Sequence, residues 1–179
     1  MSSKIVLTGY MGCGKSATAK ILSKKINFQW IDLDKFIENK ENLTIQEIFN
    51  IKGEIYFRKL EIKSLQWIIE NENNFVLSLG GGTPCFGENY KILQNIDIQS
   101  FYLQTSVNEI VNRLKYSSQS RPMLQNLKPE DMEEFISKHI FERSYYYNFA
   151  KFTINTDKKD NQTVVNEILN ILNTNENIH

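Results

Sequence analysis

The residues with the clearest chemistry form the segment Gly9-Tyr-Met-Gly-Cys-Gly-Lys15-Ser16. This segment fits the pattern G-x-x-x-x-G-K-[S/T], in which backbone N–H groups surround a phosphate, the lysine reaches the β- and γ-phosphates, and the hydroxyl coordinates Mg²⁺. The alternative is an ordinary glycine-rich turn, but the segment lies between an expected strand and an expected helix, where a phosphate loop must lie. We therefore expect a nucleotide site formed by Gly12, Cys13, Gly14, Lys15, Ser16 and Ala17.

Two carboxylates, Asp32 and Asp34, lie at the end of the second expected strand. Ligands of open α/β sheets bind at the carboxyl ends of the strands, so both aspartates belong to the same edge as the phosphate loop. One can serve the metal and the other a substrate hydroxyl; alternatively, either one caps the helix that follows. Ser78 stands where many proteins with this loop carry a strand-end aspartate, which favours Asp32 as the metal's acidic partner.

Arginine is rare in this chain, which has seventeen lysines and four arginines. The planar guanidinium grips carboxylate or phosphate with two bonds, so each arginine is a candidate site residue. Arg58 lies between Glu54 and Glu61 at helical spacing, which either orients it or forms a solvated charged face. Arg121 lies in a polar stretch, residues 116–128, long enough to be a mobile lid, from which an arginine can reach a transferring phosphate. Arg143 lies near a helix end among aromatics, where a cation is also favourable without any ligand.

Three consecutive glycines, Gly80 to Gly82, follow a short apolar strand. A backbone without side chains lets an oxygen-rich ligand approach closely, although a tight turn would use the same residues. Metal-ligand spacing is missing around His139 and His179, so we do not expect a zinc site. Cys13 occupies a free position of the phosphate loop, and we interpret it as a small filler rather than a redox group.

Composition excludes several other functions. The 179 residues fit a single domain, and 21 basic residues balance 21 acidic ones, so no net field recruits nucleic acid or anionic lipid. No apolar run approaches the roughly 18 to 20 residues of a membrane helix. Two cysteines and an N-terminal segment unlike a signal peptide favour the reducing cytoplasm.

Apolar runs alternate with segments of helical period, which predicts βα units around a parallel sheet. No linker or repeat divides the chain. The expected strands are residues 5–8, 28–32, 75–79, 98–103 and 152–155. The expected helices are residues 15–26, 33–39, 44–51, 54–71, 88–94, 106–115, 129–146 and 160–172, with a break at Gly53 and a frayed end over 173–179.

Taken together, these motifs resemble the shikimate kinase family, which has a P-loop fold like that of nucleoside monophosphate kinases. The resemblance runs from Ile5 to about Ala150 and rests on six ordered motifs. They are the G-x-x-G-x-G-K-S loop, the D-x-D at 32–34, the run F-x-x-x-G-E-x-x-F-R-x-x-E over 49–61, the triple glycine, R-P-x-L at 121 and E-R-x-x-x-Y ending at Tyr147.

The resemblance implies transfer of the γ-phosphoryl group of ATP to the 3-hydroxyl of shikimate, on the route to chorismate and the aromatic amino acids. It also implies a three-layer α/β fold with a five-stranded parallel sheet of order 2-3-1-4-5. A lid over about 116–128 and a helical substrate-binding subdomain over about 33–63 complete this single-domain fold. The implied chain is a cytoplasmic monomer that binds ATP and shikimate, with no nucleic-acid or membrane partner.

The same resemblance implies a role for each matching residue. Arg58 and Arg143 clamp the substrate carboxylate, the glycines 80–82 contribute backbone contacts, and Asp34 holds ring hydroxyls and is placed to act as the base. Lys15 and Arg121 stabilise the transferring phosphoryl, which makes Lys15, Asp34 and Arg121 the expected catalytic residues. Ser16 and Asp32 hold Mg²⁺, directly or through water.

One position departs from the family pattern. The family often carries a basic residue seven positions before the lid arginine to cover adenine, and that position is Leu114. Arg113 or Lys115 can replace it. Two other functions stay open: a related hydroxy-acid kinase such as a gluconate kinase, and a catalytically silent nucleotide-binding module. The triple glycine and the Phe57-Arg58 helix favour shikimate over the first, and intact Lys15, Asp34 and Arg121 disfavour the second.

Overall fold

The computed structural model describes residues 3–115 and 131–176. Its strands are β1 (Lys4–Thr8), β2 (Gln29–Asp32), β3 (Phe75–Ser78), β4 (Ile98–Gln104) and β5 (Phe152–Asn155). Its α-helices are α1 (Lys15–Ile26), α2 (Leu33–Glu41), α3 (Ile45–Asn71), α4 (Val107–Lys115), α5 (Met132–Tyr147) and α6 (Asn161–Glu176). Two short 3₁₀ turns, η1 (Thr83–Cys85) and η2 (Asn89–Gln94), lie between β3 and β4.

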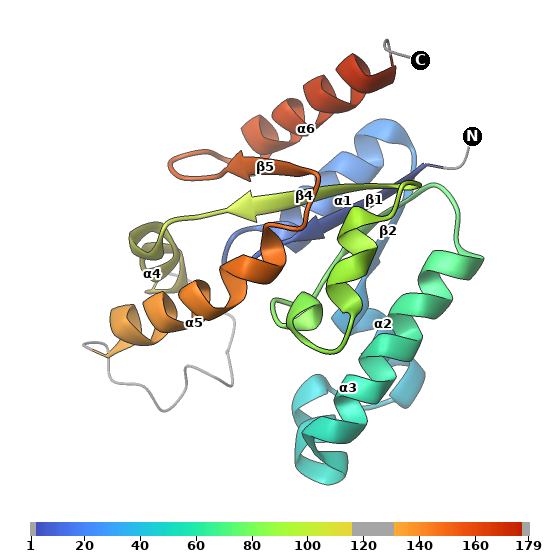
Figure 1. Ribbon diagram of the computed structural model, residues 1–179, viewed down its shortest axis with the longest axis vertical. Coiled ribbons are helices and arrows are strands. Elements are labelled where there is room, and N and C mark those ends of the chain that lie inside the picture. The colour runs from blue at the N-terminus through green and yellow to red at the C-terminus, as the bar shows by residue number, and fades with distance from the viewer. Residues whose placement is uncertain (1–2, 116–130, 177–179) are drawn as a thin grey trace.

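The strands form one parallel sheet in the order β2-β3-β1-β4-β5 (Figure 1). This order confirms the predicted α/β fold and its 2-3-1-4-5 sheet. A parallel sheet buries both of its faces under helices, so its central strands are apolar on both sides. β1 shows this well, because Ile5, Val6 and Leu7 are all nearly inaccessible to solvent.

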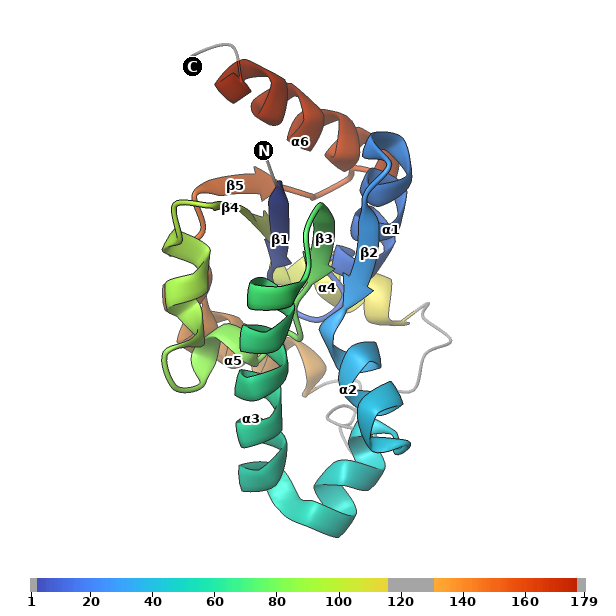
Figure 2. The same ribbon diagram turned by 90° about the vertical axis from the view of Figure 1, so that its right-hand side faces the viewer.

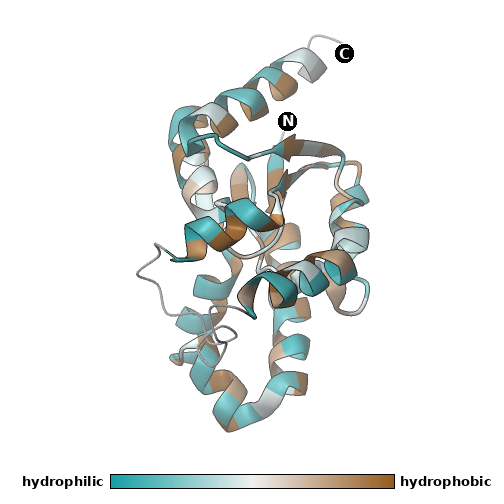
Figure 3. Ribbon diagram, turned by 90° about the vertical axis from the view of Figure 1, so that its left-hand side faces the viewer, coloured by the Kyte–Doolittle hydropathy of each residue, from teal (hydrophilic) through white to brown (hydrophobic). Residues whose placement is uncertain are grey.

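The two faces of the sheet pack against different helices. Val6 belongs to a core that includes Leu65 and Ile68 of α3, whereas its neighbour Leu7 belongs to a core that includes Leu22 of α1 and Val165 of α6. Side chains of a strand alternate between faces, so β1 contributes to both cores. Hydrophobic and hydrophilic residues alternate along α6, which ends at C in Figure 3, as expected for a helix with one buried face. The result is a three-layer α/β/α sandwich.

Helices α2 and α3 leave the carboxyl end of β2 and return the chain to the amino end of β3 (Figure 2). Thr44 and Glu47 form a reciprocal capping box that starts α3. Gly53 then interrupts the helix with φ 80° and ψ 166°, a conformation that other residues rarely adopt. The predicted break at Gly53 is therefore confirmed, and it turns the chain back toward the sheet.

Most predicted elements agree with the observed ones, with two corrections. The segment predicted as a helix at residues 88–94 forms the 3₁₀ turn η2 over Asn89–Gln94. The last helix does not fray after Leu172, because α6 continues to Glu176 and Thr174 donates to the carbonyl of Asn170 at 2.8 Å. The helical spacing of apolar residues in α6 ends before the backbone hydrogen bonds of the helix do. None of the helices in the described ranges has the length and apolar content of a membrane span.

Candidate active site

The glycine-rich loop of residues 9–16, called the P-loop below, connects β1 to the first turn of α1. At Gly9 a Cβ would lie 2.7 Å from the backbone oxygen of Leu103, so no side chain fits there. Gly14 caps α1 in a left-handed conformation with φ 98°. The free N–H groups of the first turn of α1 consequently face the loop, which is the geometry of an anion site.

Lys15 places its ammonium group inside this loop. Its side chain is buried, and Nζ donates to the carbonyl oxygens of Gly9 at 2.8 Å and Tyr10 at 2.9 Å. These bonds bend the lysine back over its own loop. The positive charge is therefore held at the surface where the N–H groups converge, as a phosphate site requires.

Asp32 is the last residue of β2, and its side chain reaches the P-loop. Its Oδ2 accepts hydrogen bonds from Ser16 Oγ at 2.7 Å and from Ser78 Oγ at 3.0 Å, and its Oδ1 accepts from the N–H of Lys35 at 3.3 Å. The last contact caps α2. The capping interpretation is thus correct for Asp32, and the same carboxylate faces the hydroxyl of the P-loop, while its role toward the metal stays a prediction.

Asp34 is the second residue of α2, and its carboxylate lies against the triple glycine. A Cβ on Gly80 would lie 3.0 Å from Asp34 Oδ1, so the missing side chain makes room for the carboxylate. Burial, followed by the charges of Asp32, Glu61 and Glu38, raises the pKa of Asp34 to about 6, although Lys15 acts in the opposite direction. A carboxylate with a pKa close to neutrality is well suited to accept a proton.

Arg58 is fixed by two carboxylates of its own helix. Its NH1 donates to Glu61 at 2.9 Å, and its Nε lies 3.4 Å from Glu54. Glu61 is only 1% exposed, and it also accepts a hydrogen bond from Thr83 Oγ1 at 2.6 Å. The alternative of a solvated charged face is therefore wrong, because the Glu61 end of the ladder is buried under η1.

We expect the two carboxylates that flank Arg58 to differ in their contribution to stability. Glu61→Gln should lower the free energy of unfolding by about 1–3 kcal/mol, because it removes one partner of a largely buried ion pair. Glu54→Gln is the matched control: Glu54 is 56% exposed and should contribute about 0.5 kcal/mol or less. Urea denaturation of both variants measures the difference. Equal losses would show that burial of Glu61 is energetically unimportant.

The ring of Phe86 stacks on Arg58, with the guanidinium carbon 3.5 Å from its centroid. Phe57 and Phe49 lie further from the same carbon, at 5.1 and 6.0 Å. A cation held over aromatic faces keeps its plane fixed. Its edge is directed toward Gly82, where a Cβ would lie 3.4 Å from Arg58 NH2. Phe49 and Phe57 belong to the same sequence motif as Arg58, whereas Phe86 lies outside it and only the η1 turn brings it there.

The triple glycine thus contacts a different functional group at each residue. Gly80 adjoins Asp34 and Gly82 adjoins Arg58, while a Cβ on Gly81 would lie 3.3 Å from the backbone nitrogen of Met11 in the P-loop. The fully buried Tyr147 donates its hydroxyl proton to the carbonyl of Gly81. The turn is therefore anchored from α5 and touches the P-loop with main-chain atoms alone.

Arg143 belongs to α5 and lies beside Tyr10 of the P-loop. Its guanidinium carbon is 5.7 Å from the centroid of Tyr10, and it contributes, together with Arg58, to the electrostatic environment of Cys85. Burial raises the pKa of the Cys85 thiol to about 11, against the effect of both arginines. The charges of the two arginines, which belong to different helices, therefore both act on the same short turn, as expected for residues that share an anionic ligand.

A cavity of about 350 Å³ joins these groups. Its lining includes Gly12, Gly14, Lys15 and Ser16 of the P-loop, together with Ala17, Asp32, Asp34, Gly80 and Gly81. Among the described residues, the lining does not include Cys13, Gly82, Arg58 or Arg143. Of these, Gly82, Arg58 and Arg143 continue the site along the triple glycine. Arg121 and the predicted lid, residues 116–128, lie outside the described residues.

Comparison with known proteins assigns this arrangement to a family. Residues 11–173 match the family described as shikimate kinase. The chain is 47% identical over 169 residues to the shikimate kinase of Flavobacterium johnsoniae, covering 94% of this chain and 98% of that protein. The chain belongs to the shikimate kinase family. The family resemblance inferred from the six motifs is thereby confirmed.

Solved structures of shikimate kinases share the fold over nearly their whole length. The enzyme of Bacteroides thetaiotaomicron superposes with a TM-score of 0.90 at 33% identity, covering 97% of this chain and 99% of that one. The enzyme of Acinetobacter baumannii, solved in complex with shikimate, gives a TM-score of 0.87 at 29% identity, covering 98% and 95%.

Proposed function

We propose that this chain transfers the γ-phosphoryl group of ATP to the 3-hydroxyl of shikimate. One observation carries the proposal: the turn Gly80–Gly82 brings together the P-loop, the carboxylate of Asp34 and the guanidinium of Arg58. An acceptor with a hydroxyl near one end and a carboxylate at the other matches this sequence of groups. The shikimate kinase complex from Acinetobacter baumannii, which superposes on this chain, supports the same acceptor.

In this proposal each group has one task. Arg58 and Arg143 bind the shikimate carboxylate, while Asp34 orients the reacting hydroxyl and takes its proton. Lys15 stabilises charge on the transferring phosphoryl, and Arg121, assigned from the sequence alone, does the same. Residues 12–17 bind the phosphates through N–H groups and glycines 80–82 line the acceptor. It stays a prediction that the chain acts as a monomer and that it has no nucleic-acid or membrane partner.

The residues present fit a magnesium ion bound with ATP. Ser16 Oγ and Asp32 Oδ2 lie 2.7 Å apart and are hard oxygen donors, as Mg²⁺ prefers. Mg²⁺ is commonly held by one or two such groups plus phosphate oxygens, so a single carboxylate suffices. When bound, the ion neutralises charge that develops on the phosphates.

The direct test is release of ADP from MgATP with shikimate, quinate and gluconate offered separately. We expect turnover with shikimate and little with the other two acids. Preferential turnover with gluconate would instead identify a gluconate kinase. Binding of MgATP without turnover of any of the three would identify a silent nucleotide-binding module.

Arg58 should not tolerate lysine, because an ammonium keeps the charge but loses the two parallel N–H bonds and the stack on Phe86. We expect Arg58→Lys to raise the KM for shikimate about tenfold or more, since a charge-assisted hydrogen bond contributes about 1.5–3 kcal/mol. The KM for ATP should change little. Steady-state kinetics with each substrate varied in turn measure both constants.

The neighbouring exposed residue provides the control, because Lys59→Gln removes a positive charge from the same helix without touching the turn. It should leave both KM values near wild type. An analogue with a neutral carboxamide should bind poorly to the wild type, yet lose little more in Arg58→Lys. A wild-type KM for shikimate in Arg58→Lys would place the carboxylate elsewhere.

A further inference from the structure

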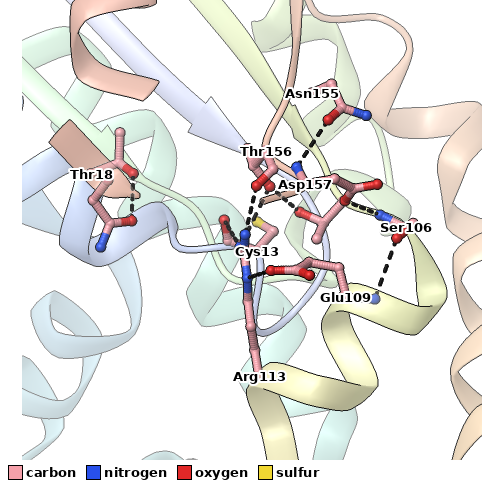
Figure 4. A network of polar contacts seen from close by, with 10 residues as sticks. Cys13, Thr18, Ser106, Glu109, Arg113, Asn155, Thr156 and Asp157 are labelled. Atoms are coloured by element: carbon pink, nitrogen blue, oxygen red, sulfur yellow. Dashed lines mark hydrogen bonds and ion pairs between the residues drawn. The ribbon is translucent and has the colours of Figure 1, made fainter. Parts of the chain in front are cut away.

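Arg113 of α4 spans two segments that lie far apart in the chain (Figure 4). Its NH2 donates to the carbonyl of Thr156 at 2.6 Å, and its NH1 donates to the carbonyl of Cys13 in the P-loop at 3.3 Å. NH1 also lies 3.5 Å from Thr156 Oγ1, and Nε donates to Glu109 at 2.9 Å. The guanidinium therefore connects the P-loop to the segment that follows β5.

The Thr156 end of this bridge is firmly attached to the sheet. Thr156 is 1% exposed, its N–H donates to the carbonyl of Gln104 at 2.8 Å, and its hydroxyl lies 2.6 Å from that of Thr105. Figure 4 shows Thr156 and Cys13 beside the guanidinium of Arg113. Because Thr156 is held by the end of β4, Arg113 fixes Cys13 relative to the sheet rather than to a free loop.

The consequence for the P-loop follows from the planarity of the peptide bond. The carbonyl of Cys13 and the N–H of Gly14 belong to one trans peptide unit and point in opposite directions. Arg113 holds this carbonyl on its own side, so the N–H of Gly14 is directed the other way. Gly14 lines the cavity and has φ 98°, a position where glycine allows the peptide to rotate unless something holds it.

We propose that Arg113 is a positioning residue of the nucleotide site, which holds the Cys13–Gly14 peptide so that the N–H of Gly14 faces the phosphates. The inference rests on the proposed function only because that function identifies the bound anion as the phosphates of a nucleotide. It differs from the role expected from the sequence, in which Arg113 or Lys115 covers adenine. The donors of Arg113 point at protein acceptors, and Lys115 is an exposed side chain at the end of α4.

The decisive experiment compares two ligands that share phosphates and differ in the base. Isothermal titration of Arg113→Met with ADP and with inorganic tripolyphosphate should show both affinities reduced by the same factor, about tenfold. Shikimate affinity should stay within about twofold of the wild type, because the triple glycine is anchored separately by Tyr147. Lys138→Met, which removes an exposed charge from α5, is the matched control and should change neither phosphate affinity.

Two further variants test the geometry. Arg113→Lys should lose less affinity than Arg113→Met, because an ammonium can still donate to one of the carbonyls. Glu109→Gln should weaken tripolyphosphate binding slightly on its own and add nothing in the Arg113→Met background, since Glu109 acts only through the guanidinium. Thermal unfolding of each variant checks that the fold is retained.

Loss of ADP affinity with unchanged tripolyphosphate affinity would overturn the proposal and assign Arg113 to the base. Unchanged affinity for both ligands would show that the bridge has no role in binding. A parallel loss of shikimate affinity would reduce Arg113 to a general support of the fold. These titrations need no acceptor turnover, so failure of the shikimate assay would leave their result intact.

Discussion

Replacing Asp34 with asparagine should stop turnover and at the same time make the folded chain more stable. The amide cannot take a proton, so kcat should fall about 10²–10⁴-fold, the usual contribution of general base catalysis. MgATP should still bind, because the P-loop is untouched. The coupled ADP-release assay and titration with nucleotide measure these two effects separately.

The gain in stability follows from the raised pKa of Asp34, about 6 in the fold against 3.8 for an ordinary aspartate. Between these values the folded state binds more protons than the unfolded state, so its stability falls as pH rises. Above pH 6 the charged carboxylate therefore costs stability, and the amide removes that cost. We expect Asp34→Asn to gain about 1–3 kcal/mol at pH 7.5 and much less near pH 4.

Urea denaturation in EDTA without nucleotide, at both pH values, tests this sign. Asp97→Asn is the control, because it makes the same chemical change at an exposed position of the chain. It should alter neither kcat nor the pH dependence of stability. A near-normal kcat in Asp34→Asn would remove the base role, and a loss of stability at pH 7.5 would show that Asp34 is a structural residue.

Lys15→Ala should abolish phosphoryl transfer, with kcat lower by about 10³-fold or more, as for loss of a preorganised charged donor at a transferring group. The reason is the position of Nζ, which the carbonyls of Gly9 and Tyr10 hold inside the P-loop. Shikimate affinity should change little. Rapid-quench measurement of product formation, together with titration of shikimate, separates the two effects.

Lys24→Ala provides the control on the same helix, since Lys24 lies exposed in the last turn of α1. Its kcat should equal that of the wild type. If Lys15→Ala keeps a tenth or more of the wild-type kcat, the charge that the transfer needs must come from another residue. A strong loss of shikimate affinity in Lys15→Ala would instead indicate that the P-loop supports the acceptor site.

Local sequence signals were sufficient where one segment determines its own structure. α1 begins at Lys15 and ends at Ile26 as predicted, because Gly14 and Asn27 adopt left-handed conformations on either side of it. The P-loop and the break at Gly53 are equally local. The resemblance to a known family, rather than periodicity, predicted the order of the strands.

These local sequence signals could not predict contacts between distant segments of the chain. Helical spacing aligned Glu61 with Arg58, but only Thr83 and the η1 turn show that Glu61 is buried. In the same way, the sequence named Arg113 only as an alternative to Lys115 for covering adenine. Its partner Thr156 lies 43 residues further along the chain, and no pattern within α4 indicates it.

The contact between Gly81 and Met11 has a consequence for inhibitors and for resistance. A compound that bridges both substrate sites would cross this contact, where it meets backbone atoms rather than side chains. Point substitutions change side chains, so they offer the enzyme few ways to evade such a compound at the crossing itself. A substitution at Gly81 would place its Cβ 3.3 Å from the nitrogen of Met11 and would disturb the P-loop along with the inhibitor. We therefore expect resistance substitutions among the residues that contact the two ends of the compound, which are its adenine end and its carboxylate end.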